Sequence, residues 1–319
     1  MTMTPASVLC PVDFSAASRG ALRYAAAIAA HFGGRLTLLA VNDPLLVEAD
    51  EFAGEAHLTE HTTQELKRFA GRALEEEATV SPETRLEVAT GKPAPEILRV
   101  ARETRCDLIV MSSHGATGAR RLFFGSTTER VLRETATPVL VTPAADPGPE
   151  RLEDGPRLVR RVLAPVDLTG ATARQLRIAG GLADAIQVPL ILLHVVEPVR
   201  GLSTSQPRLS KIDAERRYQA ERDLEAAIET LPQRIKPEAL VVYGEPAEEI
   251  AKVAVDRDAG LIVVGLHSSP VLGPRMGSVT YRVLCLAHRL MLALPPAPLG
   301  SVPLHGEVRA ESQSTLTSR

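Results

Sequence analysis

Short unbroken apolar runs alternate along the chain with longer helical patterns. The runs that we expect to form strands in the first half of the chain are 7–12, 35–42, 86–90, 107–111 and 138–142. Apolar runs without polar alternation are typical of strands buried on both faces. Helical patterns stand between them at 16–31, at about 55–79, after Gly91 and from 127 onward, and Ser15 is placed as the N-cap of the first. Strands that alternate with helices predict a parallel sheet covered on both faces.

The same pattern then occurs a second time. Residues 162–167 (VLAPVD) repeat residues 8–13 (VLCPVD) at an offset of 154, and residues 190–195 (LILLHV) repeat residues 36–41 (LTLLAV) at the same offset. Gly277-Ser278 repeats Gly125-Ser126 at an offset of 152. A register that drifts so little indicates a tandem duplication.

The duplication divides the chain into four parts. We expect a first domain over 1–143, a linker over 144–158, a second domain over 159–294 and a flexible tail over 295–319. The linker is rich in proline, glycine and charge and has no hydrophobic period. The tail is polar and contains several prolines.

Composition excludes several classes of partner. The net charge of −3 and the absence of tryptophan argue against nucleic acid as a ligand. No apolar run approaches the roughly 20 residues needed to cross a bilayer, and the N-terminus does not resemble a signal peptide. The three cysteines have no close spacing. We therefore expect reduced thiols and a cytoplasmic protein with no membrane partner.

The segment 111–127 (MSSHGATGARRLFFGST) is the main candidate for binding chemistry. It joins a predicted buried strand to a predicted helix and is rich in glycine and hydroxyl side chains. Glycines allow the backbone to approach an anion closely, and the first N–H groups of a helix attract negative charge. The pattern predicts a phosphate-binding loop.

The spacing of this loop is similar to a known motif. Ser112-x2-Gly115-x9-Gly125-Ser126 resembles the G-x2-G-x9-G-[S/T] nucleotide loop of the universal stress proteins, with serine in place of the first glycine. With the P-V-D strand ends and the duplication, the chain resembles a tandem universal stress protein. The resemblance implies an α/β fold of two Rossmann-like domains, each a five-stranded parallel sheet of order 3-2-1-4-5 with helices on both faces. A ligand crevice would lie at the carboxyl ends of strands 1 and 4.

The resemblance also implies the ligand, an adenine nucleotide: ATP, with or without Mg²⁺, with AMP or ADP as alternatives. The residues that it implies for the first domain are Pro11, Val12, Asp13, Val41, Met111, Ser112, His114, Gly115, Gly118, Gly125, Ser126, Thr127 and Thr128. Asp13 would touch ribose or metal, or else cap the helix that follows it. His114 is expected to be a loop residue rather than a catalyst, and Arg120 and Arg121 either screen phosphates or face solvent.

The second repeat retains fewer of these features. Its corresponding residues are Pro165, Val166, Asp167, Val195, Gly265, Gly277 and Ser278. Ser268 replaces the middle glycine, and the interval to Gly277 is one residue shorter and holds Pro270 and Pro274, which lack N–H donors. His194 and Leu266 add bulk near the expected crevice. We predict that the second domain binds nucleotide poorly or not at all.

Three functions fit the sequence to different degrees. The first is a nucleotide-binding stress-response regulator or sensor, and the second is an interaction module whose loops no longer hold a ligand. The third, an enzyme of the wider adenine-nucleotide α-hydrolase-like group, would need a glycine-rich loop after the first strand, where residues 13–18 hold none. No known catalytic or metal-binding motif is present. We expect no catalytic residues, no metal site formed by side chains, and at most slow incidental hydrolysis of ATP.

Pairing of the domains is also implied by the resemblance. In that family domains pair through their last strands, so the two halves would form an internal pseudo-dimer. A homodimer of whole chains and an unidentified protein partner are further expectations.

Overall fold

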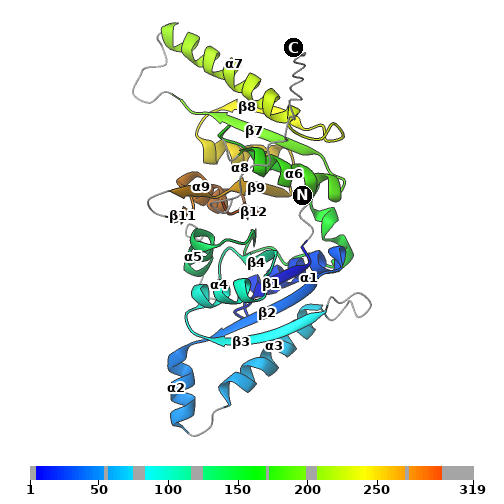
Figure 1. Ribbon diagram of the computed structural model, residues 1–319, viewed down its shortest axis with the longest axis vertical. Coiled ribbons are helices and arrows are strands. Elements are labelled where there is room, and N and C mark those ends of the chain that lie inside the picture. Colours follow the sequence, from blue (N-terminus) through cyan, green and yellow to red (C-terminus); the bar gives the residue numbers. More distant parts are fainter. Residues whose placement is uncertain are drawn as a thin grey trace, which may run out of the picture.

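The computed structural model of the chain describes residues 5–53, 57–74, 83–115, 125–169, 172–198, 207–269 and 273–296. Ten strands form one continuous sheet in the order β3-β2-β1-β4-β5-β12-β9-β6-β7-β8 (Figure 1). All neighbouring strands run parallel except β5 and β12, which are antiparallel. The sheet therefore consists of two five-stranded parallel units, half one (β1 to β5) and half two (β6 to β12). The predicted α/β class is confirmed.

Half one begins with a strand and then alternates helices and strands, with two helices in succession after β2. Its elements are β1 (Ser7–Pro11), α1 (Ala16–Phe32), β2 (Arg35–Asn42), α2 (Pro44–Phe52), α3 (Leu58–Leu74), β3 (Thr84–Thr90), α4 (Pro93–Glu103), β4 (Leu108–Ser112), α5 (Ser126–Glu134) and β5 (Val139–Thr142). The helix expected over about 55–79 corresponds to α3, and most of its expected end residues lie outside the described residues; the separate helix α2 before it was not predicted. The Asp43 side chain caps α2 by accepting from the Leu45 N–H, and Pro44 occupies its first position.

Half two follows a similar order, with the one described helix α7 at the place of α2 and α3. Its elements are β6 (Val162–Pro165), α6 (Thr172–Ala185), β7 (Leu190–Val196), α7 (Pro207–Glu229), β8 (Glu238–Tyr243), α8 (Pro246–Asp256), β9 (Leu261–Gly265), β10 (His267–Ser269), β11 (Gly273–Arg275), α9 (Ser278–Leu286) and β12 (Leu290–Leu294). Between β9 and α9, the β10–β11 hairpin forms its own two-stranded antiparallel sheet, and most of the equivalent segment of half one, residues 116–124, lies outside the described residues.

Helices cover both faces of the sheet and bury its apolar strands. One core lies between the sheet and α1, α3, α6 and α7, and the other lies between the sheet and α4, α5, α8 and α9. Successive residues of β1 alternate between the two: Val8 and Cys10 belong to the first core and Leu9 to the second, and all three are fully buried. Burial on both faces explains the unbroken apolar runs in the sequence.

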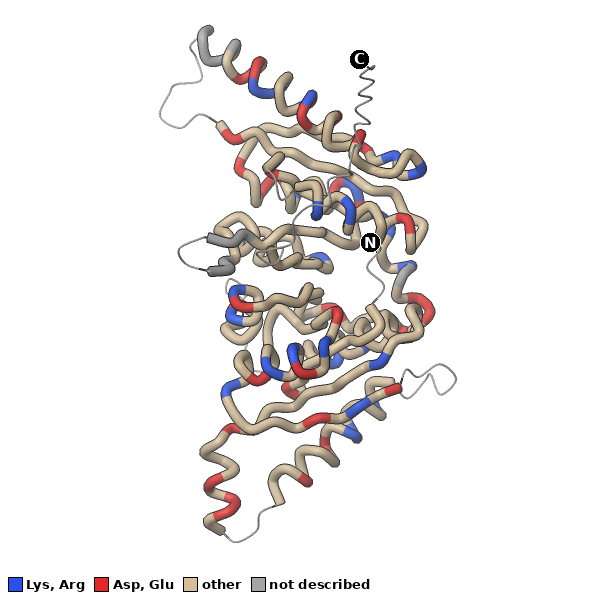
Figure 2. Tube along the Cα trace, viewed as in Figure 1, with Lys and Arg blue, Asp and Glu red and all other residues tan. Residues whose placement is uncertain are grey.

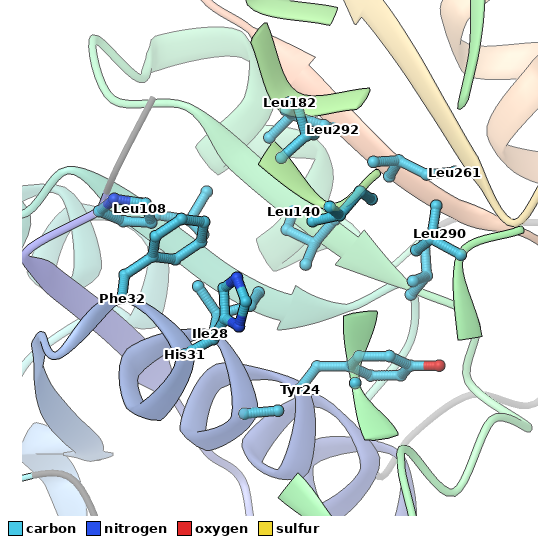
Figure 3. A pocket seen from close by; sticks show the side chains of 15 residues that line it. Tyr24, Ile28, His31, Phe32, Leu108, Leu140, Leu182, Leu261, Leu290 and Leu292 are labelled. Atoms are coloured by element: carbon cyan, nitrogen blue, oxygen red, sulfur yellow. The ribbon is translucent and has the colours of Figure 1, made fainter. Parts of the chain in front are cut away.

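The seam between the halves is antiparallel and apolar. Residues 139–141 of β5 pair with 291–293 of β12. On the face of α1 and α6, a cavity of about 90 Å³ crosses this seam, and its walls include Ile28, Leu108 and Leu140 from half one and Leu261 and Leu292 from half two (Figure 3). The two halves thus pair through their last strands as an internal pseudo-dimer.

The segment that connects the halves packs against α1. It contains two short 3₁₀ turns, Leu152–Asp154 and Pro156–Leu158, and Leu152 is buried. Tyr24 Oη donates to Asp146 Oδ2 at 3.0 Å, and the Asp146 carbonyl lies so close to Gly20 that no Cβ would fit there. Burial, followed by the Asp146 carboxylate, raises the pKa of Tyr24.

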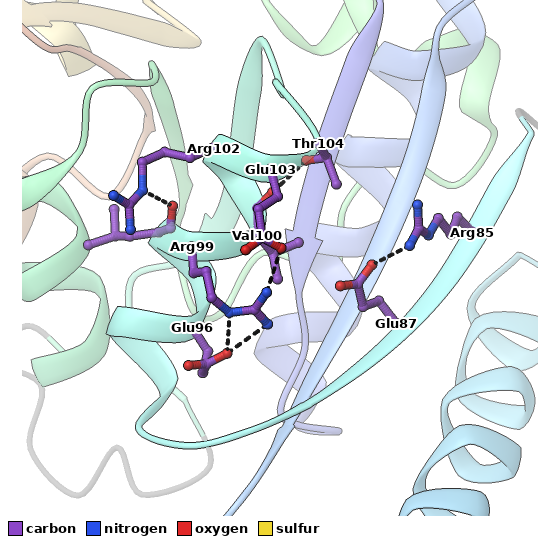
Figure 4. Close-up of polar contacts among 9 residues, drawn as sticks. Arg85, Glu87, Glu96, Arg99, Val100, Arg102, Glu103 and Thr104 are labelled. Atoms are coloured by element: carbon purple, nitrogen blue, oxygen red, sulfur yellow. Dashed lines mark hydrogen bonds and ion pairs between the residues drawn. The ribbon is translucent and has the colours of Figure 1, made fainter.

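The outer surface carries charges of both signs. Basic and acidic residues alternate along α7, while α2 carries only acidic ones (Figure 2). On α4, Arg99 pairs with Glu96 at 2.8 Å and with Glu103 (Figure 4). Such partly exposed pairs add little to stability. Within the described ranges, no helix has the length and apolar character needed to span a membrane.

Candidate functional site

The order of strands reverses between β1 and β4, and the predicted site lies at their carboxyl ends. The two strands pair in parallel, Val8 opposite Leu108. The segments that follow them therefore meet, and the Asp13 carboxylate lies directly against Gly115, with its Oδ2 where a Cβ on Gly115 would stand. The structure thus brings together two residues that are 102 positions apart in the sequence.

Asp13 also organises the turn into α1. Its Oδ1 accepts from the Ser15 N–H at 3.1 Å, and Ser15 in turn caps α1 by accepting from the Ser18 N–H at 3.1 Å. Phe14 between them takes a left-handed conformation with φ of 63°, and Leu168 takes the same conformation at the equivalent place in half two. One Asp13 oxygen is therefore used in the turn while the other faces Gly115.

Hydrogen bonds within the chain hold the end of β4. The Ser112 hydroxyl donates to the His114 carbonyl, and Thr128 Oγ1 donates to the Ser112 carbonyl at 2.9 Å. The Ser113 hydroxyl accepts from the Ala144 N–H at 3.1 Å and lies 3.1 Å from His114 Nδ1. Ser112 and Thr128 are both buried. These two predicted residues shape the site from within, and the Thr128 hydroxyl proton already has a partner.

Serine at position 112 fits the backbone there. Ser112 is not among the described residues with positive φ, so the conformation at this position does not require glycine. Its side chain turns into the loop toward His114.

Helix α5 begins at this site without a side-chain cap. Its N-cap is Gly125, whose own N–H donates to the Ser113 carbonyl at 2.9 Å. The first N–H groups of a helix, here those of Ser126, Thr127 and Thr128, have no partner within the helix. A glycine cap offers them no oxygen, so they form a place of positive potential for an anion.

Several other predicted residues of half one are buried or half-buried. Val12 and Met111 are buried, and Pro11, Val41 and His114 are half-buried. Gly118, Arg120 and Arg121 lie outside the described residues.

Half two contains a crevice at the equivalent place, with a volume of about 870 Å³. This lies within the range of small-molecule sites. The predicted residues that line it are Pro165, Val166, Asp167, Val195 and Gly265. Gly277 and Ser278 begin α9, whose following residues Val279 and Thr280 also line it. The weakened motif predicts poor nucleotide binding in half two, yet the structure has a crevice there.

Two side chains in this crevice have no counterpart in half one. His194 Nδ1 lies 2.9 Å from the Val166 carbonyl, and the sequence comparison had already singled His194 out. Gln175 was missed: its Nε2 donates to the carbonyls of Pro165 at 2.7 Å and Val263 at 2.9 Å. The signal was present in the repeat, because an offset of 154 places Gln175 opposite Ala21.

Nucleophilic chemistry is not supported by the buried thiols. Burial raises the pKa of Cys10 and raises that of Cys106 to about 12, so both stay protonated at neutral pH. Among the side chains that the structure describes, no group of three or more His, Cys, Asp or Glu could hold a metal ion. The arrangement in half one is suited to binding an anion through backbone N–H groups.

Comparison with known proteins gives one consistent result. The family model of the Universal stress protein family matches residues 6–143 and, a second time, residues 159–293. Universal stress protein MJ0577 of Methanocaldococcus jannaschii is 27% identical over 158 residues, which cover 44% of this chain and 96% of the relative. Universal stress protein MJ0531 of the same organism is 31% identical over 140 residues, which cover 42% of this chain and 79% of the relative.

Solved structures show the same fold over nearly the whole chain. A universal stress protein from Archaeoglobus fulgidus aligns with 91% of this chain and 98% of its own, with a TM-score of 0.60 and 19% identity. At this identity the likeness concerns the fold alone.

Proposed function

Because the chain belongs to the universal stress protein family, we propose that it binds an adenine nucleotide, ATP in the first place, in the crevice of half one. The phosphates lie at the start of α5, and the nucleoside lies between the ends of β1 and β2. Pro11, Val12 and Val41 flank the adenosine in this arrangement. Asp13 Oδ2 contacts the ribose or a phosphate-bound Mg²⁺.

One observation carries the proposal. Helix α5 starts at a glycine with no side-chain cap, whereas α1 and α2 have capping side chains and α4, which also lacks a side-chain cap, starts at Lys92. Beside this uncapped start, Gly115 allows close approach to the end of β1. An uncapped helix start next to a glycine at the strand crossover is suited to a phosphate group.

We propose a binding function rather than catalysis. Backbone N–H groups and the hydroxyls of Ser126 and Thr127 bind phosphate oxygens, but they supply no general base. Hydrolysis of ATP is then at most slow and incidental. The protein acts as a stress-response regulator or nucleotide sensor, through a protein partner and as a homodimer if whole chains pair further. The free cysteines fit a reducing compartment such as the cytoplasm.

A second function is favoured by a different observation. The hydroxyls of Ser112 and Thr128 are used within the chain, and Val12 and Met111 at the strand ends belong to the two cores. These features are sufficient for an interaction module that binds no nucleotide.

The melting temperature of the full chain with and without MgATP separates the two functions. A ligand at one hundred times its Kd stabilises the folded state by about 2.7 kcal/mol, which raises the melting temperature by several degrees. We expect this rise with MgATP. No rise with ATP, ADP or AMP would favour the ligand-free module.

A further inference from the structure

The crevice of half two carries polar side chains at two positions where the repeat places alanine in half one. Gln175 and His194 line it, and the repeat places Ala21 and Ala40 at the same positions in half one. Half two has therefore gained two hydrogen-bonding side chains at the place where half one has only methyl groups.

The Gln175 amide oxygen is directed into the crevice. Its side chain is 7% exposed, and its Nε2 faces two carbonyl oxygens, which only accept. The nitrogen assignment is therefore fixed, and Oε1 lies on the other side, 3.5 Å from the Cβ position of Gly265 in the crevice wall. Within the described part of the chain, no hydrogen bond reaches this oxygen. An amide oxygen that faces the crevice can accept a hydrogen bond from a ligand donor.

His194 supplies a second acceptor. Its Nδ1 lies 2.9 Å from the Val166 carbonyl, which can only accept, so Nδ1 carries the proton. In the neutral ring Nε2 is then an acceptor. Two acceptors on one wall match a ligand with amino and hydroxyl donors, as a purine nucleoside has.

The phosphate side of the same crevice has lost donors. In the β10–β11 ladder, His267 pairs with Arg275 and Ser269 with Gly273, on either side of Pro274. Because Pro274 has no N–H, the flanking pairs are the ones that exchange backbone hydrogen bonds. The N–H groups of His267, Ser269, Gly273 and Arg275 therefore face the opposite strand rather than a ligand. The Leu266 N–H is also used, since it donates to the Leu294 carbonyl at 2.7 Å.

One anion site remains, and the surrounding charge is negative. Helix α9 starts at Gly277 with no side-chain cap, which leaves the N–H groups of its first turn for one phosphate. Among the described residues that line the crevice, Asp167, Glu197 and Asp223 carry negative charge and Arg216, which donates to the Glu197 carbonyl, carries positive charge. A triphosphate tail would be repelled here.

We propose that the half-two crevice binds an adenine nucleoside with no more than one phosphate, adenosine or AMP, and rejects ATP, with Gln175 as the specificity-determining residue. The identity of the base rests on the proposed function. With ATP in half one and AMP in half two, one chain responds to the ratio of the two nucleotides.

Calorimetric titration of the full chain with AMP and with MgATP tests this proposal. Gly115→Val fills the site of half one, and Gly265→Val fills half two in front of Oε1 while leaving both Gln175 hydrogen bonds intact. We expect Gly115→Val to bind no ATP and one equivalent of AMP. We expect Gly265→Val to bind one equivalent of ATP and no AMP. Gln175→Ala should weaken AMP about tenfold, as expected for one lost hydrogen bond in a buried site.

The outcomes separate the two proposals. If the wild type binds one equivalent of ATP and Gly115→Val binds no AMP, the half-two proposal is overturned and the proposed function is left intact. Two equal ATP sites would also overturn it. AMP binding in Gly115→Val with no ATP binding in the wild type would support half two and contradict the ATP site of half one. If no adenine nucleotide binds, both proposals fail.

Discussion

Gly125 lies against the backbone of Ser113: its N–H donates to the Ser113 carbonyl at 2.9 Å, and a Cβ on Gly125 would stand 3.1 Å from the same oxygen. This contact joins the end of β4 to the start of α5 across the loop. A Cβ at this position is a tight fit that a small shift can accommodate, and the φ of −63° is open to any residue. The contact also places the uncapped start of α5 beside the proposed site.

A carboxylate at position 125 should compete with phosphate. Gly125→Asp would place an N-cap oxygen on the first N–H groups of α5, where Asp is a favoured cap. We expect the affinity for ATP to fall at least about tenfold, because the anion site is then occupied from within. Fluorescence or calorimetric titration measures the change.

The repeat supplies the matched control for this variant. Gly277→Asp makes the same change at the start of α9. Affinity for ATP should not change in Gly277→Asp. An equal loss in both variants would show that the effect is not specific to half one.

Two neighbouring threonines should separate stability from binding. Thr128→Val removes the buried bond to the Ser112 carbonyl and should lower the free energy of unfolding by about 1–2 kcal/mol. Thr127 is half-buried, and its equivalent in half two is Val279. Thr127→Val should leave the free energy of unfolding unchanged and lower the affinity for ATP. Urea unfolding and ATP titration of both variants check this, and a loss of stability in Thr127→Val instead would mean that the two roles are reversed.

Thr142 should tolerate loss of its hydroxyl. The side chain is fully buried, and its Oγ1 has no hydrogen-bond partner in the described structure. The repeat places Leu294 at the equivalent position. Because an unpaired buried hydroxyl is destabilising, Thr142→Val should raise the free energy of unfolding by about 1 kcal/mol. A clear loss of stability in urea unfolding would show that the hydroxyl has a partner, such as a bound water.

Tyr24 should make stability fall at alkaline pH. Its folded-state pKa is raised above the ordinary value of 10.0, mainly by burial and then by Asp146. A raised pKa means that the folded state holds the proton more tightly, so this contribution is complete below pH 10 and is lost as pH rises above it. Tyr24→Phe should lower stability at neutral pH by about 1–2 kcal/mol through the lost bond to Asp146, and should flatten the decline above pH 10.

The exposed Tyr218 is the control for the neutral-pH effect. Tyr218→Phe should leave the free energy of unfolding unchanged at pH 7. If Tyr24→Phe behaves in the same way at all pH values, the contact of the connecting segment with α1 contributes nothing to stability.

Local signals predicted the elements where they were strong. Unbroken apolar runs located the buried strands such as β4, and Ser15 marked the start of α1 with its cap. The Asp43-Pro44 pair is an equally clear start signal, yet α2 was missed because the residues after it are mostly exposed and give no buried face.

Some contacts between distant parts of the chain could not be predicted from the sequence. The connecting segment has no hydrophobic period, but Leu152 reaches the core and Asp146 meets Tyr24. The prolines of the half-two loop suggested only missing donors, whereas the structure forms a hairpin there. Gln175 lies on a helix with no motif around it, and only its place above two strand ends gives it a role.

Titration of MgATP into the wild-type chain and into Gly115→Val, side by side, tests the central claim most directly. Gly71→Ala serves as the control glycine, since a Cβ at position 71 meets no atom within 4 Å. We predict about one equivalent of ATP bound to the wild type and to Gly71→Ala, and none to a folded Gly115→Val. Undiminished binding in Gly115→Val, or no binding in the wild type, would contradict a nucleotide site at the ends of β1 and β4.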